Sequence, residues 1–202
     1  MRSPDPIILA REPQEVMTLE EAKSFCRITH ELDDVLLADL IEGCVKRAER
    51  ILDKSLVETT YRVVYDAFPG LDAFGRIRLE LPRPPVSEIV AFKILTDGGV
   101  EKNMTVGVDY YVGLQGNYPY VRPVSRCWPR VADRPEAIVI DVKCAPPEHI
   151  DKDIKIAIGS LIAFYYTNRE VADLQQGASG YAEAPGVVAI ERILWSYKRP
   201  KL

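Results

Sequence analysis

The sequence predicts an α+β fold, with a mainly helical body and a small antiparallel β subdomain inserted between the N-terminal helices and a long central C-terminal helix. Two patterns support this prediction: apolar residues recur at three- and four-residue steps towards both ends of the chain, and at every second residue in its middle. Because the strands are grouped rather than alternating with helices, the elements are segregated as in α+β proteins. We expect an extended arm at residues 1–17, a helical pair at 18–58, the β subdomain at 59–146, the central helix at 147–170, and a flexible segment with a short final helix at 171–202.

The N-terminal part is predicted to hold an arm and two helices. Residues 1–16 contain three prolines and no usable period, which indicates an extended arm rather than a packed element. Thr18 and Glu21 have the spacing of a capping box, so a short helix is predicted to begin there. A longer amphipathic helix is predicted at residues 35–53, because its apolar residues recur with helical spacing.

The middle of the chain has the period of half-buried strands. Residues 61–68 and 77–81 alternate between apolar and polar side chains, and a hairpin is indicated by Asp97-Gly98-Gly99. Further strands are predicted at residues 86–96, 109–114, 118–122 and 137–144. Together these segments make an antiparallel β unit between helices.

The predicted central helix, residues 150–170, is apolar on nearly every side. One face carries Ile150, Ile154, Ala157, Leu161, Phe164 and Tyr165, and the opposite face of the later turns carries Ile156, Gly159, Ala163 and Tyr166. A helix that is apolar all round must be buried all round. In so small a soluble chain this predicts either the centre of its own core or a wall shared with another subunit.

The chain is predicted to end with a mobile segment and a short helix. Residues 171–185 are rich in small and polar residues and lack a period, so we expect them to be mobile or to order only against a partner. The final helix, at about residues 187–197, would place Val187, Ile190, Ile193, Leu194 and Tyr197 on one side. Arg199 and Lys201 follow it with positive charge.

Composition excludes several classes of protein. A net charge of -4 argues against a general nucleic-acid-coating protein, which needs a basic surface to displace counterions. The four cysteines are widely spaced without a CxxC motif, and only His30 and His149 could join them, so buried thiols in a reducing compartment are expected rather than a zinc site. The longest apolar stretch is too short to span a bilayer. We expect a cytosolic protein or part of a particle assembled in the cytosol, without a membrane partner.

No motif for catalysis, cofactor binding or metal binding is found. The chain has no GxxxxGK or GxGxxG loop for phosphates, and its two histidines flank helix starts amid charged residues rather than a nucleophile. Acidic pairs such as Asp33-Asp34 stand where helices begin and where carboxylates stabilise the helix dipole. The sequence therefore predicts no enzyme and no cofactor.

Two alternatives remain open at this stage. A nucleic-acid-binding module would use the tyrosines and Trp128 of the β unit together with its arginines as a stacking surface, although aromatics at the rim of a small sheet are the commoner reason for such a composition. A small hydrolase is the weaker alternative, because no pair of nucleophile and base can be nominated.

The order of several short motifs resembles the head-tail connector (adaptor) family of tailed phages, whose members also occur in gene transfer agents. The resemblance is carried by MTLEEAKSFCRI at residues 17–28, Asp33-Asp34, Ala48-Glu49, Thr59-Thr60-Tyr61, Phe68-Pro69-Gly70, Leu81-Pro82-Arg83-Pro84-Pro85-Val86, Asp109-Tyr110-Tyr111, Trp128-Pro129, Phe164-Tyr165-Tyr166 and Asn168-Arg169-Glu170. It covers residues 17–170. The arm at residues 1–16 and Lys143-Cys144-Ala145-Pro146 depart from the family pattern, so partner contacts are not carried over there.

The resemblance implies a structural protein of the virion at the head-tail junction, assembled in the host cytoplasm. By this resemblance about twelve copies form a closed ring below the portal protein, bind a stopper or tail-completion protein on the other side, and let genome DNA pass through the lumen without sequence-specific binding. We expect Ile156, Ala163 and Tyr166, with apolar residues of the 35–52 helix, to form the subunit interface. Trp195, Ile193, Arg199 and Lys201 are expected to dock on the portal or on a neighbouring subunit.

Overall fold

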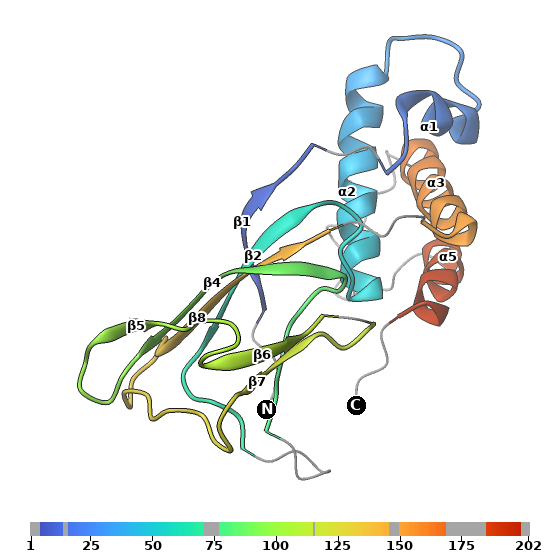
Figure 1. Cartoon of the computed structure of the whole chain (residues 1–202). Helices are drawn as coiled ribbons and strands as arrows, with labels where there is room; N and C mark the ends of the chain where they lie inside the picture. The colour runs from blue at the N-terminus through green and yellow to red at the C-terminus, as the bar shows by residue number, and fades with distance from the viewer. Residues whose placement is uncertain are drawn as a thin grey trace, which may run out of the picture. The chain divides into compact units, whose positions relative to one another are not determined.

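The computed structural model describes residues 5–13, 16–70, 77–114, 116–145, 150–168 and 185–198, and the chain divides into two compact units. A β unit contains Met1–Gln14 and Val57–Pro147, and a helical unit contains Glu15–Leu56 and Glu148–Leu202 (Figure 1). The predicted α+β class is confirmed, because helices and antiparallel sheets occupy separate parts of the chain.

The β unit contains two antiparallel sheets. The five-stranded sheet has the order β1-β2-β8-β4-β5 and the three-stranded sheet has the order β3-β7-β6 (Figure 1). The strands are β1 (Ile7–Arg11), β2 (Thr59–Tyr65), β3 (Leu79–Glu80), β4 (Val86–Leu95), β5 (Glu101–Asn103), β6 (Tyr110–Gly113), β7 (Tyr120–Pro123) and β8 (Ile138–Cys144). The period-two segments of the sequence thus become strands, and Asp97-Gly98-Gly99 lies in the turn between β4 and β5.

Side chains from both sheets form one apolar core. Strand β2 alternates strictly between buried and half-buried residues, and its inward side chains Tyr61 and Val63 lie in the same cluster as Leu79 of β3 and Val121 of β7. On the other face of the larger sheet, Arg62 is directly opposite Asp141 and donates two hydrogen bonds to it, at 2.7 and 2.8 Å. A bidentate pair of this kind adds geometric specificity as well as energy, so it favours the observed register of β2 and β8.

The N-terminal segment differs from the extended arm that the sequence predicts. Its residues Ile7–Arg11 form β1, which pairs with β2 as an antiparallel edge strand of the larger sheet. Prolines flank this run at Pro6 and Pro13, where a strand can end without losing ladder hydrogen bonds. A register shift between Ile8 and Ala10 disrupts the alternation, which is why no period was visible in the sequence.

The helical unit contains four helices within the described residues: α1 (Leu19–Cys26), α2 (Asp34–Leu52), α3 (Lys152–Thr167) and α5 (Pro185–Ser196). The predicted capping box is confirmed, because the Thr18 hydroxyl accepts from the Glu21 amide and the Glu21 carboxylate accepts from the Thr18 amide. Helix α3 packs against α1, α2 and α5, so it is the central helix of this unit (Figure 1).

Burial of α3 within one copy is one-sided, so the helix does not lie at the centre of its own core on every side. The other alternative, a wall shared with another subunit, stays a prediction. Its buried residues are Ile154, Ala157, Ile158, Gly159, Leu161 and Ile162. Ile156 is 49% exposed, and Ala163 and Tyr166 are half-buried. The helix therefore buries most of its apolar surface within its own unit and leaves a smaller apolar part exposed.

Gly159 allows α1 and α3 to approach closely. A Cβ atom built at this position would lie 2.5 Å from two ring carbons of Phe25 on α1. Real Cβ atoms do not approach other carbons so closely, so either the ring or the helix would have to move.

We therefore expect Gly159→Ala to lower the free energy of unfolding by about 1–3 kcal/mol through overpacking, measured by urea denaturation. Gly43→Ala is the matched control, because Gly43 is also helical but its Cβ would meet nothing within 4 Å. The control should gain up to about 1 kcal/mol from the higher helix propensity of alanine. Equal effects at the two positions would contradict the close approach at Phe25.

Candidate interaction surfaces

A groove lies between α1 and α3 in the helical unit. It has a volume of about 310 Å³ and is lined by Met17, Glu21, Ser24, Phe25, Lys152, Lys155 and Ile156. Met17 is buried, whereas Phe25 and Ile156 are partly exposed on opposite walls. The groove thus offers apolar surface between two helices whose spacing is set by Gly159.

The rim of this groove is basic with one acidic partner. Lys155 Nζ lies 3.3 Å from Glu21 Oε1, and Lys152 is exposed nearby. The pKa of Glu21 is lowered chiefly by the hydrogen bond from the Thr18 backbone amide, with a smaller contribution from Lys155. Glu21 is therefore ionised at neutral pH and offsets one of the two lysines, which leaves the rim with a net positive charge.

The three residues predicted for the subunit interface have different environments. Ile156 lies on the groove wall and is exposed. Ala163 is half-buried near the other end of the helix. The hydroxyl of Tyr166 donates a hydrogen bond of 2.5 Å to Asp33 Oδ2, the residue before α2, so this side chain connects α3 to α2 inside the subunit. Of the three, Ile156 presents the clearest free apolar surface.

Exposed apolar side chains also gather where the α1–α2 connection enters α2. Leu32 is 90% exposed, Val35 is 79% exposed, and Leu36 adds a third partly exposed side chain. Val35 and Leu36 belong to the predicted apolar stripe of α2, whereas Leu32 is a single leucine between acidic residues and belongs to no periodic pattern.

Helix α5 has one face inside the unit and one face outside it. Val187, Glu191 and Leu194 are buried, and Glu191 forms an ion pair with Arg47 of α2. The predicted docking residues Ile193 and Trp195 are on the outside, where Trp195 is 57% exposed and Lys198 Nζ lies 4.3 Å from the centre of its ring. Arg199 and Lys201 lie outside the described residues.

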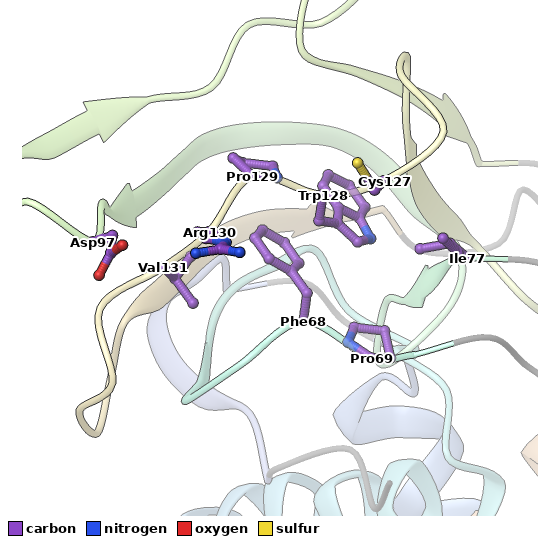
Figure 2. A pocket seen from close by; sticks show the side chains of 9 residues that line it. All are labelled: Phe68, Pro69, Ile77, Asp97, Cys127, Trp128, Pro129, Arg130 and Val131. Carbon is purple, nitrogen blue, oxygen red and sulfur yellow. The ribbon is translucent and has the colours of Figure 1, made fainter.

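In the β unit, a second cavity of about 450 Å³ surrounds an aromatic pair. The rings of Phe68 and Trp128 stack with centroids 4.4 Å apart, and Trp128 is only 9% exposed. Figure 2 shows this pair at the centre of the pocket, with Asp97 and Arg130 on one side and Cys127 and Ile77 on the other. Its other lining residues are Pro69, Pro129 and Val131.

The described lining of this cavity does not combine a nucleophile with a base. Among the described residues that line it, Cys127 is an exposed thiol and none is a histidine. None of the four cysteines forms a disulfide, and burial raises the pKa of the Cys44 thiol to about 12, so this thiol stays protonated. Within the described ranges no three His, Cys, Asp or Glu side chains are placed to hold a metal ion. None of the helices described combines the length and apolar composition that a bilayer crossing requires.

The arginine and aromatic surface proposed for nucleic-acid binding is not supported. Tyr110 and Trp128 lie in the core of the β unit and offer no free ring face. Tyr111 is exposed, but Arg122 already lies over its ring, 5.5 Å from the centroid. A continuous platform for stacking bases needs several exposed rings in succession, and the described residues do not provide one.

Comparison with known proteins gives a family match and a structural match. Residues 16–71 match the family described as "Phage gp6-like head-tail connector protein", which confirms the predicted family resemblance for this part of the chain. Among curated proteins, none matches the sequence. The matched residues include α1, α2 and β2, and therefore one wall of the groove and the exposed apolar residues before and within α2.

Several solved structures share the fold over nearly the whole chain. A chain from "Virion of native gene transfer agent (GTA) particle" has a TM-score of 0.69 at 18% identity and covers 98% of this chain and 96% of its own. Chains from "Neck of empty GTA particle computed with C6 symmetry" and "Neck of native GTA particle computed with C12 symmetry" have TM-scores of 0.70 and 0.68, also at 18% identity. In both cases the match covers 98% of this chain and 97% of the other chain.

The Tyr166–Asp33 hydrogen bond predicts a stability effect that is separate from any effect on assembly. We expect Tyr166→Phe to lower the free energy of unfolding by about 1 kcal/mol, because it removes a bond to a carboxylate but keeps the ring. Tyr111→Phe is the control, since Tyr111 is a partly exposed tyrosine in the β unit. Chemical denaturation measures the free energy of unfolding of both variants. If this free energy is unchanged in Tyr166→Phe, the hydrogen bond to Asp33 does not stabilise the subunit.

Proposed function

We propose that the protein is a structural head-tail connector (adaptor) of a tailed phage or phage-like particle, and that about twelve copies form a ring below the portal. The observation that carries this proposal is the match of residues 16–71 to the head-tail connector family. The end-to-end likeness to chains of gene transfer agent necks supports it, because one of those necks was computed with C12 symmetry.

The proposed role is geometric rather than chemical. A ring of this kind joins the capsid to the tail and continues the DNA channel, and it needs stable contacts between copies rather than a reaction centre. Each copy in a closed ring uses one surface to contact one neighbour and a different surface to contact the other. The groove with Ile156 and the exposed residues around Leu32 are separate apolar surfaces of the same helical unit, as such contacts require.

The partners proposed for the ring are the portal on one side and a stopper or tail-completion protein on the other. The outer face of α5, with Ile193 and Trp195, is proposed as the portal-docking surface, because a large exposed aromatic residue is typical of binding hot spots. The net charge of -4 is compatible with DNA that passes through the lumen without tight binding.

Ile156→Asp is expected to weaken ring formation about tenfold or more, because a carboxylate replaces an apolar side chain at the proposed subunit contact. Mass photometry of the protein assembled with its portal measures the number of copies bound, and electron microscopy shows whether particles acquire tails. Val108→Asp is the matched control: Val108 is 71% exposed and belongs to the β unit, whereas the residues that line the groove belong to the helical unit. If Ile156→Asp assembles as the wild type does, this contact is not at Ile156.

Trp195→Ala is expected to weaken portal binding by about tenfold or more, whereas Trp195→Phe should retain most of it, since the second variant keeps an aromatic ring. Binding of each variant to isolated portal is measured by surface plasmon resonance. Because Trp195 is more than half exposed, both variants should unfold at the wild-type temperature. Unchanged portal affinity in Trp195→Ala would exclude α5 as the docking surface.

A further inference from the structure

We propose that neighbouring copies meet by a knob-and-groove contact, in which the Leu32 knob of one copy enters the α1/α3 groove of the next. The Leu32 knob is defined as Leu32, Val35 and Leu36, and the α1/α3 groove as the cavity with Phe25 and Ile156 on its walls. This inference rests on the proposed ring, and it specifies which two surfaces of the chain the ring joins.

The knob is a cluster rather than a scattered apolar residue. Single exposed leucines are common on protein surfaces and need no explanation. Here, however, three apolar side chains lie within five consecutive residues, with Leu32 at 90% and Val35 at 79% exposure. The loop that carries Leu32 protrudes beyond the helices at one end of the helical unit (Figure 1). A projecting apolar cluster of this kind is stabilised when a concave surface covers it.

The groove has the size and chemistry to receive this cluster. Its volume of about 310 Å³ is at the lower end of ligand pockets, so it admits a few side chains rather than a whole helix. Met17 is buried, and Phe25 and Ile156 supply exposed apolar walls that a leucine and a valine side chain can cover. Aliphatic and aromatic side chains packed in this way remove apolar area from water on both copies.

Charge complementarity favours a second copy as the occupant. The knob is flanked by acidic residues: Glu31 is exposed, Asp33 accepts the bond from Tyr166, and Asp34 pairs with Lys23 at 2.6 Å. The groove rim carries Lys152, which is exposed, and Lys155, which forms an ion pair with Glu21. An acidic knob above a basic rim orients the contact, although each exposed ion pair alone is weak.

The contact is heterologous, because knob and groove are different surfaces of one helical unit. A copy that places its knob in a neighbour's groove still has its own groove free for a third copy. Repetition of such a contact either closes into a ring or continues as a filament, and the likeness to a C12 neck favours closure. Two copies could form a closed pair only if both knobs and both grooves engaged at once.

The test is a complementation experiment with two variants of the full chain. Leu32→Asp removes the knob and keeps the groove, whereas Ile156→Asp damages the groove and keeps the knob. Each variant alone should self-associate about tenfold or more weakly than the wild type. An equal mixture should form heterodimers that stop at two copies, because only one functional knob and one functional groove can meet. Sedimentation velocity over a range of concentrations, with and without portal, measures both outcomes.

The controls separate this inference from the ring itself. Both substituted residues are exposed, so circular dichroism and thermal unfolding should match those of the wild type, and Val108→Asp should associate normally. If the wild type forms rings and Leu32→Asp assembles normally, the proposed role of the Leu32 knob is wrong, whereas the proposed ring is unaffected. If both variants lose assembly but their mixture forms no heterodimers, the knob-and-groove contact is also wrong, and the groove binds another partner. If the wild type forms no ring even on the portal, the proposed function fails as well.

A charge exchange tests the orientation of the contact. Glu31→Lys and Lys152→Glu should each weaken association by about two- to fivefold, as expected for one exposed ion pair. The double variant should recover wild-type association at low salt, and its recovery should fade as salt rises. If the two substitutions weaken association additively in the double variant, Glu31 of one copy does not pair with Lys152 of the next.

Discussion

The interaction on which the helical unit depends is the burial of one face of α3 among α1, α2 and α5. Ile154, Ile158, Leu161 and Ile162 are almost fully buried, and each such side chain contributes about 1.5–3 kcal/mol relative to an exposed one. Gly159 sets how closely α1 can lie against this face. This packing determines three other features: the groove, the position of the α1–α2 connection and the position of α5. Each of them involves a helix that contacts α3.

Much of the architecture was predictable, because local periodicity carries it. The capping box at Thr18 located the start of α1, and the alternation around Tyr61 located β2. Pairing order was not predictable, since β2 lies next to β8 through contacts between residues about eighty positions apart, such as Arg62 and Asp141. The edge strand β1 was missed because its register shift disrupts the alternation that reveals a strand.

Interaction surfaces are harder to predict from a sequence than the fold, for a physical reason. Hydrophobicity in a sequence shows that a side chain prefers burial but does not show which neighbour buries it. On α3 the same apolar pattern contains Ile154, which is buried inside the subunit, and Ile156, which is 49% exposed. The sequence placed Tyr166 at the subunit interface but could not reveal its partner within the subunit, because its hydroxyl donates to Asp33, a residue far away in sequence. Leu32 belonged to no pattern and was visible only through its exposure.

The path of the chain between the two units has a consequence for biosynthesis. The chain contributes β1 to the β unit, supplies α1 and α2 to the helical unit, returns to complete the sheets, and only then provides α3 and α5. Glu21 and Lys155, which face each other across the groove, are 134 positions apart. During synthesis from the N-terminus, the side of α1 that packs against α3 therefore stays uncovered until roughly three quarters of the chain have been made. A nascent or prematurely terminated chain without α3 lacks one wall of the groove and, under the proposed contact, cannot receive the Leu32 knob of a neighbouring copy.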